Sequence, residues 1–347
     1  MNKKLLTIAI AGAMAAPMTA HAIKWKMSGQ VNRAVSIMDD GVQSDIRSTD
    51  NGASNTRFRM RGSEDLGNGM KVGAYWELGI NSSPSSKAFP DADNDFDGGV
   101  TIRQANVWFS GNWGKLTLGH TSEASDGTTG ADLSGTGLTH AGSGSTDNSA
   151  DIKFWLKDGT GSINQDRTYT KYDGGRKDVI RYDSPKLGPV GVAVNVSNDQ
   201  SWSAAAKVKT GLGGGQLSAA LGYSSDTGKG NVDSRWGMSA SYLFSQGTSI
   251  SGHYADNNPK NGRNSDSFSI TLGHKWGVHA VAATYSEGND IGGQDFERQG
   301  YAVEYVHNLK KVNTQLYAGY LHAELDAPVL SYEDIDFFTV GARVKFD

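Results

Sequence analysis

The chain has 347 residues, a formal net charge of −4 at pH 7 and no cysteine, which excludes disulfides, thiolate metal sites and thiol nucleophiles. It has 45 Gly, only 7 Pro and a mean hydropathy of −0.48. No apolar run after residue 22 approaches the length of about 18 residues that a membrane-spanning helix needs, so a membrane protein of this composition can only be a closed β-barrel.

The N-terminus has the pattern of a secretory signal. Lys3 and Lys4 precede an apolar stretch over residues 5–16, which is followed by a small-x-small cleavage site at residues 20–22. We expect residues 1–22 to be cleaved. Residues 23–347 are expected to form a single domain, because no linker, charge block or break in composition divides them.

The dominant pattern of the remaining chain is an alternation of apolar and polar residues in segments of about ten, which is typical of transmembrane β-strands. In the last segment Phe338, Val340 and Phe346 share one face, and Thr339 and Arg343 share the other. One face suits lipid and the other suits water. We predict sixteen such strands, an even number that brings both ends of the barrel to the same side. They begin near residues 24, 56, 69, 100, 113, 177, 189, 201, 214, 233, 247, 265, 277, 297, 312 and 334.

The predicted connections alternate between short and long, as expected for periplasmic turns and external loops. The longest runs over residues 121–175 and is rich in Gly, Ser, Thr and Asp. A connection of this length without regular structure would count against the assignment of these strands, unless the loop has a function of its own. In a pore it can fold into the lumen and narrow the channel.

The alternative is a soluble, secreted all-β protein such as a sandwich or a lectin. A sandwich needs large apolar side chains in its core, whereas the second face of these segments repeatedly carries Gly, Ser, Asn, Thr and Lys. The sequence therefore favours an all-β transmembrane antiparallel barrel.

Four motifs resemble those of Gram-negative general porins, in the same order along the chain. The resemblance covers the mature chain except its loops, and its motifs occupy residues 57–69, 103–109, 114–120 and 181–185. It implies a sixteen-stranded homotrimer in the outer membrane of a Gram-negative bacterium, in contact with lipid and lipopolysaccharide, with the third external loop inside the lumen. Two features depart from the family pattern. The terminal aromatic, Phe346, is followed by Asp347, which displaces the signal expected for the barrel-assembly machinery, and the long loop lacks a Pro-Glu-Phe-Gly element.

Arg57, Arg59 and Arg61 lie on one face of a predicted strand. At mid-depth each would cost about 2–4 kcal/mol on the lipid side, so we place them on the lumen wall. They either create a field across the constriction or belong to a solvated wall near the periplasmic rim. For Arg103 the alternation and the resemblance disagree. Alternation gives the wet face to Gln104, whereas the resemblance places Arg103 in the constriction, and we follow the resemblance.

Two groups of acids are further candidates. Glu123, Asp126 and Asp132 follow the fifth strand and are expected either to face the arginines or to be solvated. Asp93, Asp95 and Asp97 begin like a calcium loop. The twelfth position is Gln104, and no helix pattern flanks the segment, so an EF-hand is not expected and only a loose external calcium site stays open.

The sequence contains no His-Glu-x-x-His, Gly-x-Ser-x-Gly or Walker motif. We therefore predict a passive porin for small hydrophilic solutes and ions, with no enzymatic activity, no required cofactor and no nucleic-acid partner. A substrate-selective porin would need a run of lumenal aromatics, but most Trp and Tyr lie on the apolar faces. An outer-membrane adhesin or enzyme is the remaining alternative.

Overall fold

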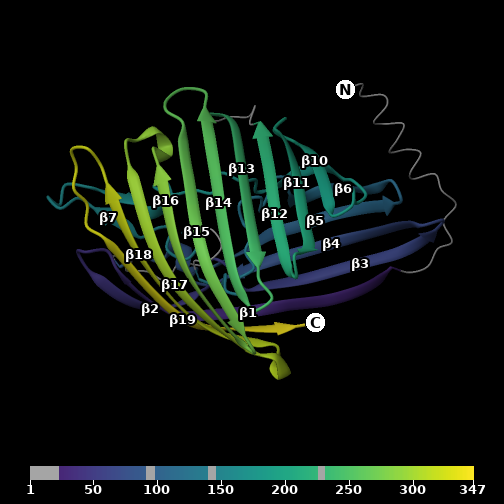
Figure 1. Cartoon of the computed structure of the whole chain (residues 1–347), viewed down its shortest axis with the longest axis horizontal. Helices are drawn as coiled ribbons and strands as arrows, with labels where there is room; N and C mark the ends of the chain where they lie inside the picture. Colours follow the sequence, from purple (N-terminus) through teal and green to yellow (C-terminus); the bar gives the residue numbers. More distant parts are fainter. Residues whose placement is uncertain (1–22, 91–97, 140–145, 226–230) are drawn as a thin grey trace.

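The computed structural model describes residues 23–90, 98–139, 146–225 and 231–347. The expected signal peptide lies outside the described residues. Within the described ranges, no helix is long and apolar enough to span a membrane. The regular elements are almost all strands (Figure 1).

The strands follow the predicted order closely, because period-two alternation places one face of each in lipid. They are β1 (Lys24–Asp39), β2 (Ser44–Asp50), β3 (Arg57–Gly67), β4 (Met70–Asn81), β5 (Gly99–Gly111), β6 (Gly114–Ser122), β7 (Lys153–Trp155), β8 (Ser162–Asn164), β9 (Arg176–Asp183), β10 (Val190–Ser197), β11 (Trp202–Leu212), β12 (Gly215–Ser225), β13 (Val232–Leu243), β14 (Thr248–Pro259), β15 (Ser265–Trp276), β16 (His279–Asn289), β17 (Glu297–Leu309), β18 (Thr314–Asp326) and β19 (Ile335–Phe346). Four 3-10 turns accompany them: η1 (Ser85–Lys87), η2 (Gln165–Arg167), η3 (Ile291–Gly293) and η4 (Lys310–Val312).

All strands except the β7–β8 hairpin form one closed antiparallel ring. β2 and β3 pair with successive parts of β1 and share one position in the ring, so the described residues form a sixteen-stranded barrel. β2 was not predicted. Its residues, Ser-Asp-Ile-Arg-Ser-Thr-Asp, carry almost no apolar signal, and residues 51–56 interrupt the ladder before β3 begins.

The ring closes where β1 pairs with β19, so that the two ends of the barrel meet (Figure 1). In this seam Gly29 lies opposite Phe346. A Cβ at Gly29 would lie 2.5 Å from the carbonyl oxygen of Arg57 and against the ring of Phe346. The seam therefore requires glycine at this position.

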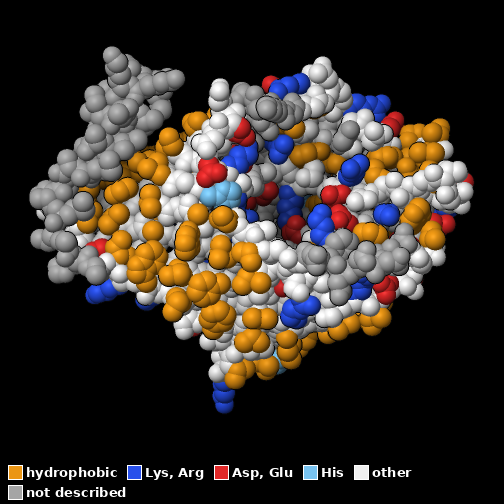
Figure 2. Space-filling model, turned by 180° about the vertical axis from the view of Figure 1, so that it is seen from behind, with side chains coloured by type: hydrophobic (Ala, Val, Ile, Leu, Met, Phe, Trp, Pro, Cys, Tyr) orange, Lys and Arg blue, Asp and Glu red, His pale blue; other side chains and the backbone are white. Residues whose placement is uncertain are grey.

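The barrel is inverted relative to a soluble protein. In β19, the side chains of Val340 and Val344 are each 47% exposed on the outside, whereas Thr339 on the inward face is 2% exposed. Figure 2 shows apolar side chains spread over the outer surface and charged side chains around a central hollow. The alternation thus separates a lipid-facing surface from a polar lumen.

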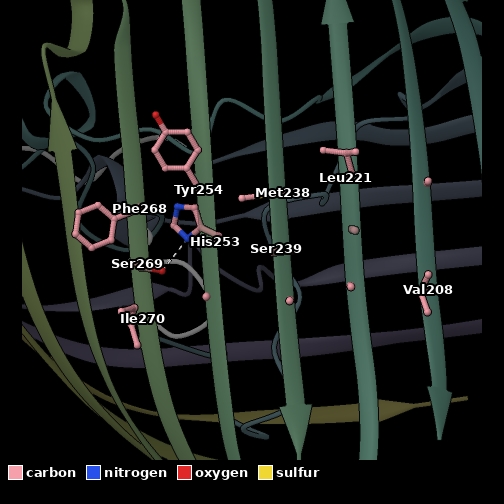
Figure 3. Close-up of a pocket in the computed structure, with 14 residues that line it drawn as sticks. Val208, Leu221, Met238, Ser239, His253, Tyr254, Phe268, Ser269 and Ile270 are labelled. Carbon is pink, nitrogen blue, oxygen red and sulfur yellow. Dashed lines mark hydrogen bonds between the residues drawn. The ribbon is translucent and has the colours of Figure 1, made fainter. Parts of the chain in front are cut away.

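An apolar hollow of about 570 Å³ lies on this outer surface across β11–β15 (Figure 3). Alanines and Gly252 leave space there between bulkier residues such as Leu221, Met238 and Phe268. His253 and Ser269 belong to the inward face and are joined by a 2.7 Å hydrogen bond (Figure 3). The hollow is therefore a feature of the lipid-facing side and lies apart from the lumen.

Candidate functional site

Arg57, Arg59 and Arg61 form a row on the inward face of β3, where the outward residues are Phe58 and Met60. The register between β1 and β3 places the three arginines opposite Gln30, Ser28 and Lys26, on the polar side of the sheet. In the structure the three arginines therefore lie on the inward, polar face of β3.

Arg103 also points into the lumen, because β5 contains a β-bulge. Glu77 pairs with Gln104, but the next residue of β4, Leu78, pairs with Ile102, which leaves Arg103 as an extra residue. An extra residue of this kind re-aims a side chain without changing the faces of its neighbours. Gln104 and Arg103 therefore both face inward, and the conflict between alternation and resemblance disappears.

The carboxylate of Glu77 is the centre of this group of arginines. Arg59 Nε donates to Oε2 and Arg103 Nε donates to Oε1, both at 2.6 Å, while Arg57 Nη1 lies 3.7 Å from Oε1. The Tyr75 hydroxyl donates to Oε2 at 2.6 Å. The side chain of Glu77 is only 5% exposed. One carboxylate thus serves three guanidinium groups, which leaves the wall positively charged. We call these four charged residues the Glu77 cluster.

Arg61 lies outside the Glu77 cluster. Its guanidinium lies 4.3 Å from the centre of the Tyr75 ring, on the side towards the short turn between β3 and β4. The row of three arginines is therefore divided. Two residues bind Glu77, and the third continues towards the end of the barrel where the short turns lie.

The first part of the long loop, residues 123–139, follows the inner wall on the opposite side. Its backbone N–H groups donate to inward side chains of successive strands: Ala124 to Asn195, Ser125 to Ser203, Ala131 to Ser239 and Leu133 to Ser241. Further along, the Thr139 hydroxyl donates to Glu304 of β17. The small polar residues of these strands are therefore partners of the loop backbone, which explains why the sequence places serines on that face.

The returning half of the loop is held by aromatic and charged contacts. Tyr169 contacts His253 of β14 and lies 4.9 Å beneath the guanidinium of Arg298 of β17, which is fully buried. Asp173 accepts hydrogen bonds from Gly127 N and from the Thr129 hydroxyl. Burial raises the pKa of Asp173, an effect that nearby Lys171 partly opposes. These contacts join the two halves of the loop.

Comparisons with known proteins agree with this architecture. The model of the Gram-negative porin family matches residues 6–328. The chain belongs to the Gram-negative porin family. Membership places it among outer-membrane channels for passive diffusion, and the family and its fold are those of channels, not of enzymes.

Individual relatives share only part of their sequence with this porin. The chain is 32% identical over 121 residues to outer membrane porin protein 32 of Delftia acidovorans, and this match covers 34% of the chain and 31% of that protein's length. An anion-selective porin from Comamonas acidovorans has the same fold, with a TM-score of 0.68, 22% identity and coverage of 94% of the chain and 100% of that structure. OmpT of Vibrio cholerae, in its trimer form, gives a TM-score of 0.60 at 15% identity, with 94% and 100% covered.

In the part of the porin that the structure describes, the loop acids Glu123, Asp126 and Asp132 form no ion pair with the arginines of β3 and β5. Glu123 is buried at the base of the loop, 3.6 Å from Lys177 and bonded to the N–H of Gly175. Asp132 accepts from Ser134 and from Ser251 of β14. Asp126 contributes its backbone oxygen to Lys207. Among the described residues, the acid that binds the arginines is Glu77, on the strand next to them.

Asp93, Asp95 and Asp97 lie outside the described residues. Elsewhere in the described part of the porin, no group of three or more His, Asp or Glu side chains is arranged to hold a metal ion.

Proposed function

We propose that this porin forms a water-filled channel through which small hydrophilic solutes and ions diffuse passively, with a preference for anions. The observation that carries the proposal is the Glu77 cluster, in which three arginines share one carboxylate on the lumen wall. The similarity to a porin described as anion-selective supports it. Neither a covalent step nor a required cofactor forms part of the proposal.

The constriction is assigned to the level of the Glu77 cluster. On one side stand Arg57, Arg59 and Arg103, with Arg61 at the next level. On the other side the long loop narrows the lumen, and Asp126 and Asp132 stand on it as side chains of intermediate exposure. A cationic wall opposite a weakly acidic loop favours anions near the wall.

Reversal potentials in a KCl gradient across a planar bilayer test this assignment. The wild-type value should indicate anion preference. Replacing Arg57, Arg59 and Arg61 together with Gln keeps long polar side chains, and should shift the reversal potential towards cations. The shift should shrink at high salt, because the screening length falls from about 10 Å at 0.1 M to about 3 Å at 1 M. An unchanged low-salt potential would place the row outside the constriction.

The porin is further proposed to be a homotrimer that packs through its early strands. An apolar hollow of about 490 Å³ lies on their outer face, lined by Trp25, Trp76 and Val107 among others. Arg33 lies on the same outward side and donates to the Ser82 carbonyl within the chain. Unheated samples should run as trimers on a detergent gel. A monomer under every mild extraction condition would contradict the trimer.

Assembly is proposed to depend on Phe346, which closes the outward face of β19 opposite Gly29. Deleting Asp347 should be harmless, whereas Phe346→Ala should reduce insertion by the barrel-assembly machinery. If Phe346→Ala inserted as well as wild type, Phe346 would not be the assembly signal.

The outer surface is expected to contact lipid and lipopolysaccharide. A loose calcium site at Asp93, Asp95 and Asp97 stays a proposal, which calcium titration of the detergent-solubilised porin tests.

A further inference from the structure

A second charged region lies in the lumen at the short-turn end of the barrel. It is a hollow of about 820 Å³ between β1, β3, β4, β5, β6 and β9. Because transmembrane barrels have short turns on the periplasmic side, this end faces the periplasm. The charged lining consists of five cations and one acid: Lys24, Lys26, Arg61, Lys115, Arg181 and Asp183.

One of the five cations has a structural role. Arg181 Nη2 lies 2.6 Å from Asp183 Oδ1, and Arg181 Nη1 donates to the carbonyls of Ser122 and Glu123. Arg181 therefore anchors the start of the long loop, and its charge is balanced by the single acid of the hollow.

The other four cations have no carboxylate within 4.0 Å in the part of the chain that the structure describes. Lys26 stands directly opposite Arg61 in the register of β1 and β3. Like charges directly opposite each other destabilise a sheet, so this pair favours an anion that neutralises both. Lys115 Nζ lies 5.3 Å from the Trp108 ring, which keeps its ammonium group at the edge of the hollow.

The arrangement suits an anion with several charged oxygens. Lys26 and Arg61 are on one side, and Lys115 is on β6, three strand spacings or about 14 Å from β3 along the wall. On β6 beside Lys115, Thr117 offers a hydroxyl, whereas the amide of Asn106 already donates to Gln104 and to the carbonyl of His120. Lysine and arginine together with neutral donors are the groups that bind phosphate oxygens. Among the described residues, four cations without a carboxylate within 4.0 Å line the hollow, although Lys115 stands opposite Asp183 in the register of β6 and β9. They match a ligand of high charge better than chloride or a single carboxylate.

We propose that this hollow is a binding site for small anions that carry three or more negative charges, of which diphosphate is the simplest, and that these anions enter it from the periplasm. The proposal rests on the anion-preferring channel proposed above. Arg59 and Arg61 are two residues apart on β3, about 7 Å. An anion in the hollow therefore stands next to the Glu77 cluster, on the path of chloride, and reduces the chloride current.

The test is one-sided block of single channels in KCl. Pyrophosphate is added to one side and then to the other, with sulfate at equal ionic strength as the comparison. We expect saturable block from one side only, and weaker block by sulfate. Lys26→Gln and Lys115→Gln should each weaken the block about tenfold, which corresponds to about 1.4 kcal/mol, because each variant loses one charge-assisted contact with the anion.

Lys209→Gln is the matched control. Lys209 is an exposed, inward-facing lysine at the short-turn end of β11 that does not line the hollow, so the same change of charge there should leave the block unchanged. Calorimetric titration of the detergent-solubilised porin with pyrophosphate gives an independent affinity for each variant, and the trimer band confirms that each one folds.

Equal block from both sides, equal potency of sulfate, or unchanged block in both lysine variants would overturn the site. The two proposals fail separately. A wild-type reversal potential that indicates cations contradicts the anion preference, whereas a normal anion preference without one-sided block removes this site alone.

Discussion

Replacing Glu77 with Gln should make the porin more anion-selective. The substitution keeps the size of the side chain and removes the one carboxylate that three arginines share. Arg57, Arg59 and Arg103 then present their full charge to the lumen. The net charge of the constriction wall rises by one unit.

The size of the effect follows from Coulomb's law. At about 6 Å from a permeating ion, a unit charge changes the ion's energy by about 0.7 kcal/mol in water. A screening length of about 10 Å at 0.1 M salt reduces this to about 0.4 kcal/mol. Anions are stabilised by this amount and cations are destabilised by it, so the free-energy difference between the two ions changes by about 0.8 kcal/mol. The anion-to-cation permeability ratio should therefore rise about fourfold. At 1 M salt the screening length is about 3 Å and the rise should be less than twofold, about 1.4-fold.

Reversal potentials at both salt concentrations measure this ratio. Glu297→Gln, on the outward face of β17, makes the same change in net charge away from the lumen and should have no effect. The double variant Glu77→Gln with Arg59→Gln restores the charge of the cluster and should return the ratio towards that of wild type. A low-salt ratio for Glu77→Gln that is unchanged, or that moves towards cations, would refute the electrostatic reasoning.

Three further predictions concern the barrel and its loop. Gly29→Val should prevent closure of the barrel, because the valine side chain would clash with the Arg57 carbonyl and the Phe346 ring. Loss of the heat-modifiable folded band on a detergent gel would report the failure to close. Val31→Ile on the same strand is the control and should keep the band. Tyr169→Leu removes the ring beneath Arg298, a cation–π interaction that contributes about 2 kcal/mol when desolvated. It should increase open-channel noise and leave the melting temperature of the barrel unchanged. Unchanged noise would show that the loop is held by other contacts. Burial raises the pKa of Asp173, so ionisation of this carboxyl opposes docking of the loop. The contribution of Asp173 to docking is therefore greatest below the pKa that the carboxyl has in the undocked loop. It is lost as the pH rises through the raised pKa of the docked loop. Noise should therefore fall on acidification in wild type and become independent of pH in Asp173→Asn; the same pH dependence in both proteins would contradict this role.

Much of the barrel could be predicted because lipid imposes a strict pattern on each strand. Val340 and Val344 must be apolar and Thr339 is free to be polar, so strands as different as β4 and β19 show the same alternation. β2 escaped prediction because its outward residues include Ser48 and Asp50 beside Ile46, and its partner Arg33 supplies a polar neighbour on the same side.

The site was less predictable because it depends on which strands are neighbours and on where a ladder shifts. The contact of Glu77 with Arg59 requires the register of the β3–β4 hairpin, which its short turn sets. The position of Arg103 depends on a bulge that alternation alone does not reveal. The partners of Glu123 and Asp132 depend on the course of the long loop, for which the sequence has no periodic signal.

The bulge in β5 has a consequence for how such a pore can change. Because side chains alternate with a period of two, inserting one residue into a regular strand normally exchanges the lipid and water faces of everything beyond it. Here Ile102 keeps its outward position and Gln104 its inward position, with Arg103 held between them. Removing Arg103 would leave an uninterrupted alternation on both sides. A charged group at the lumen wall can thus be gained or lost as a single-residue insertion or deletion, and ion preference can evolve by a change of length without rewriting the rest of the strand.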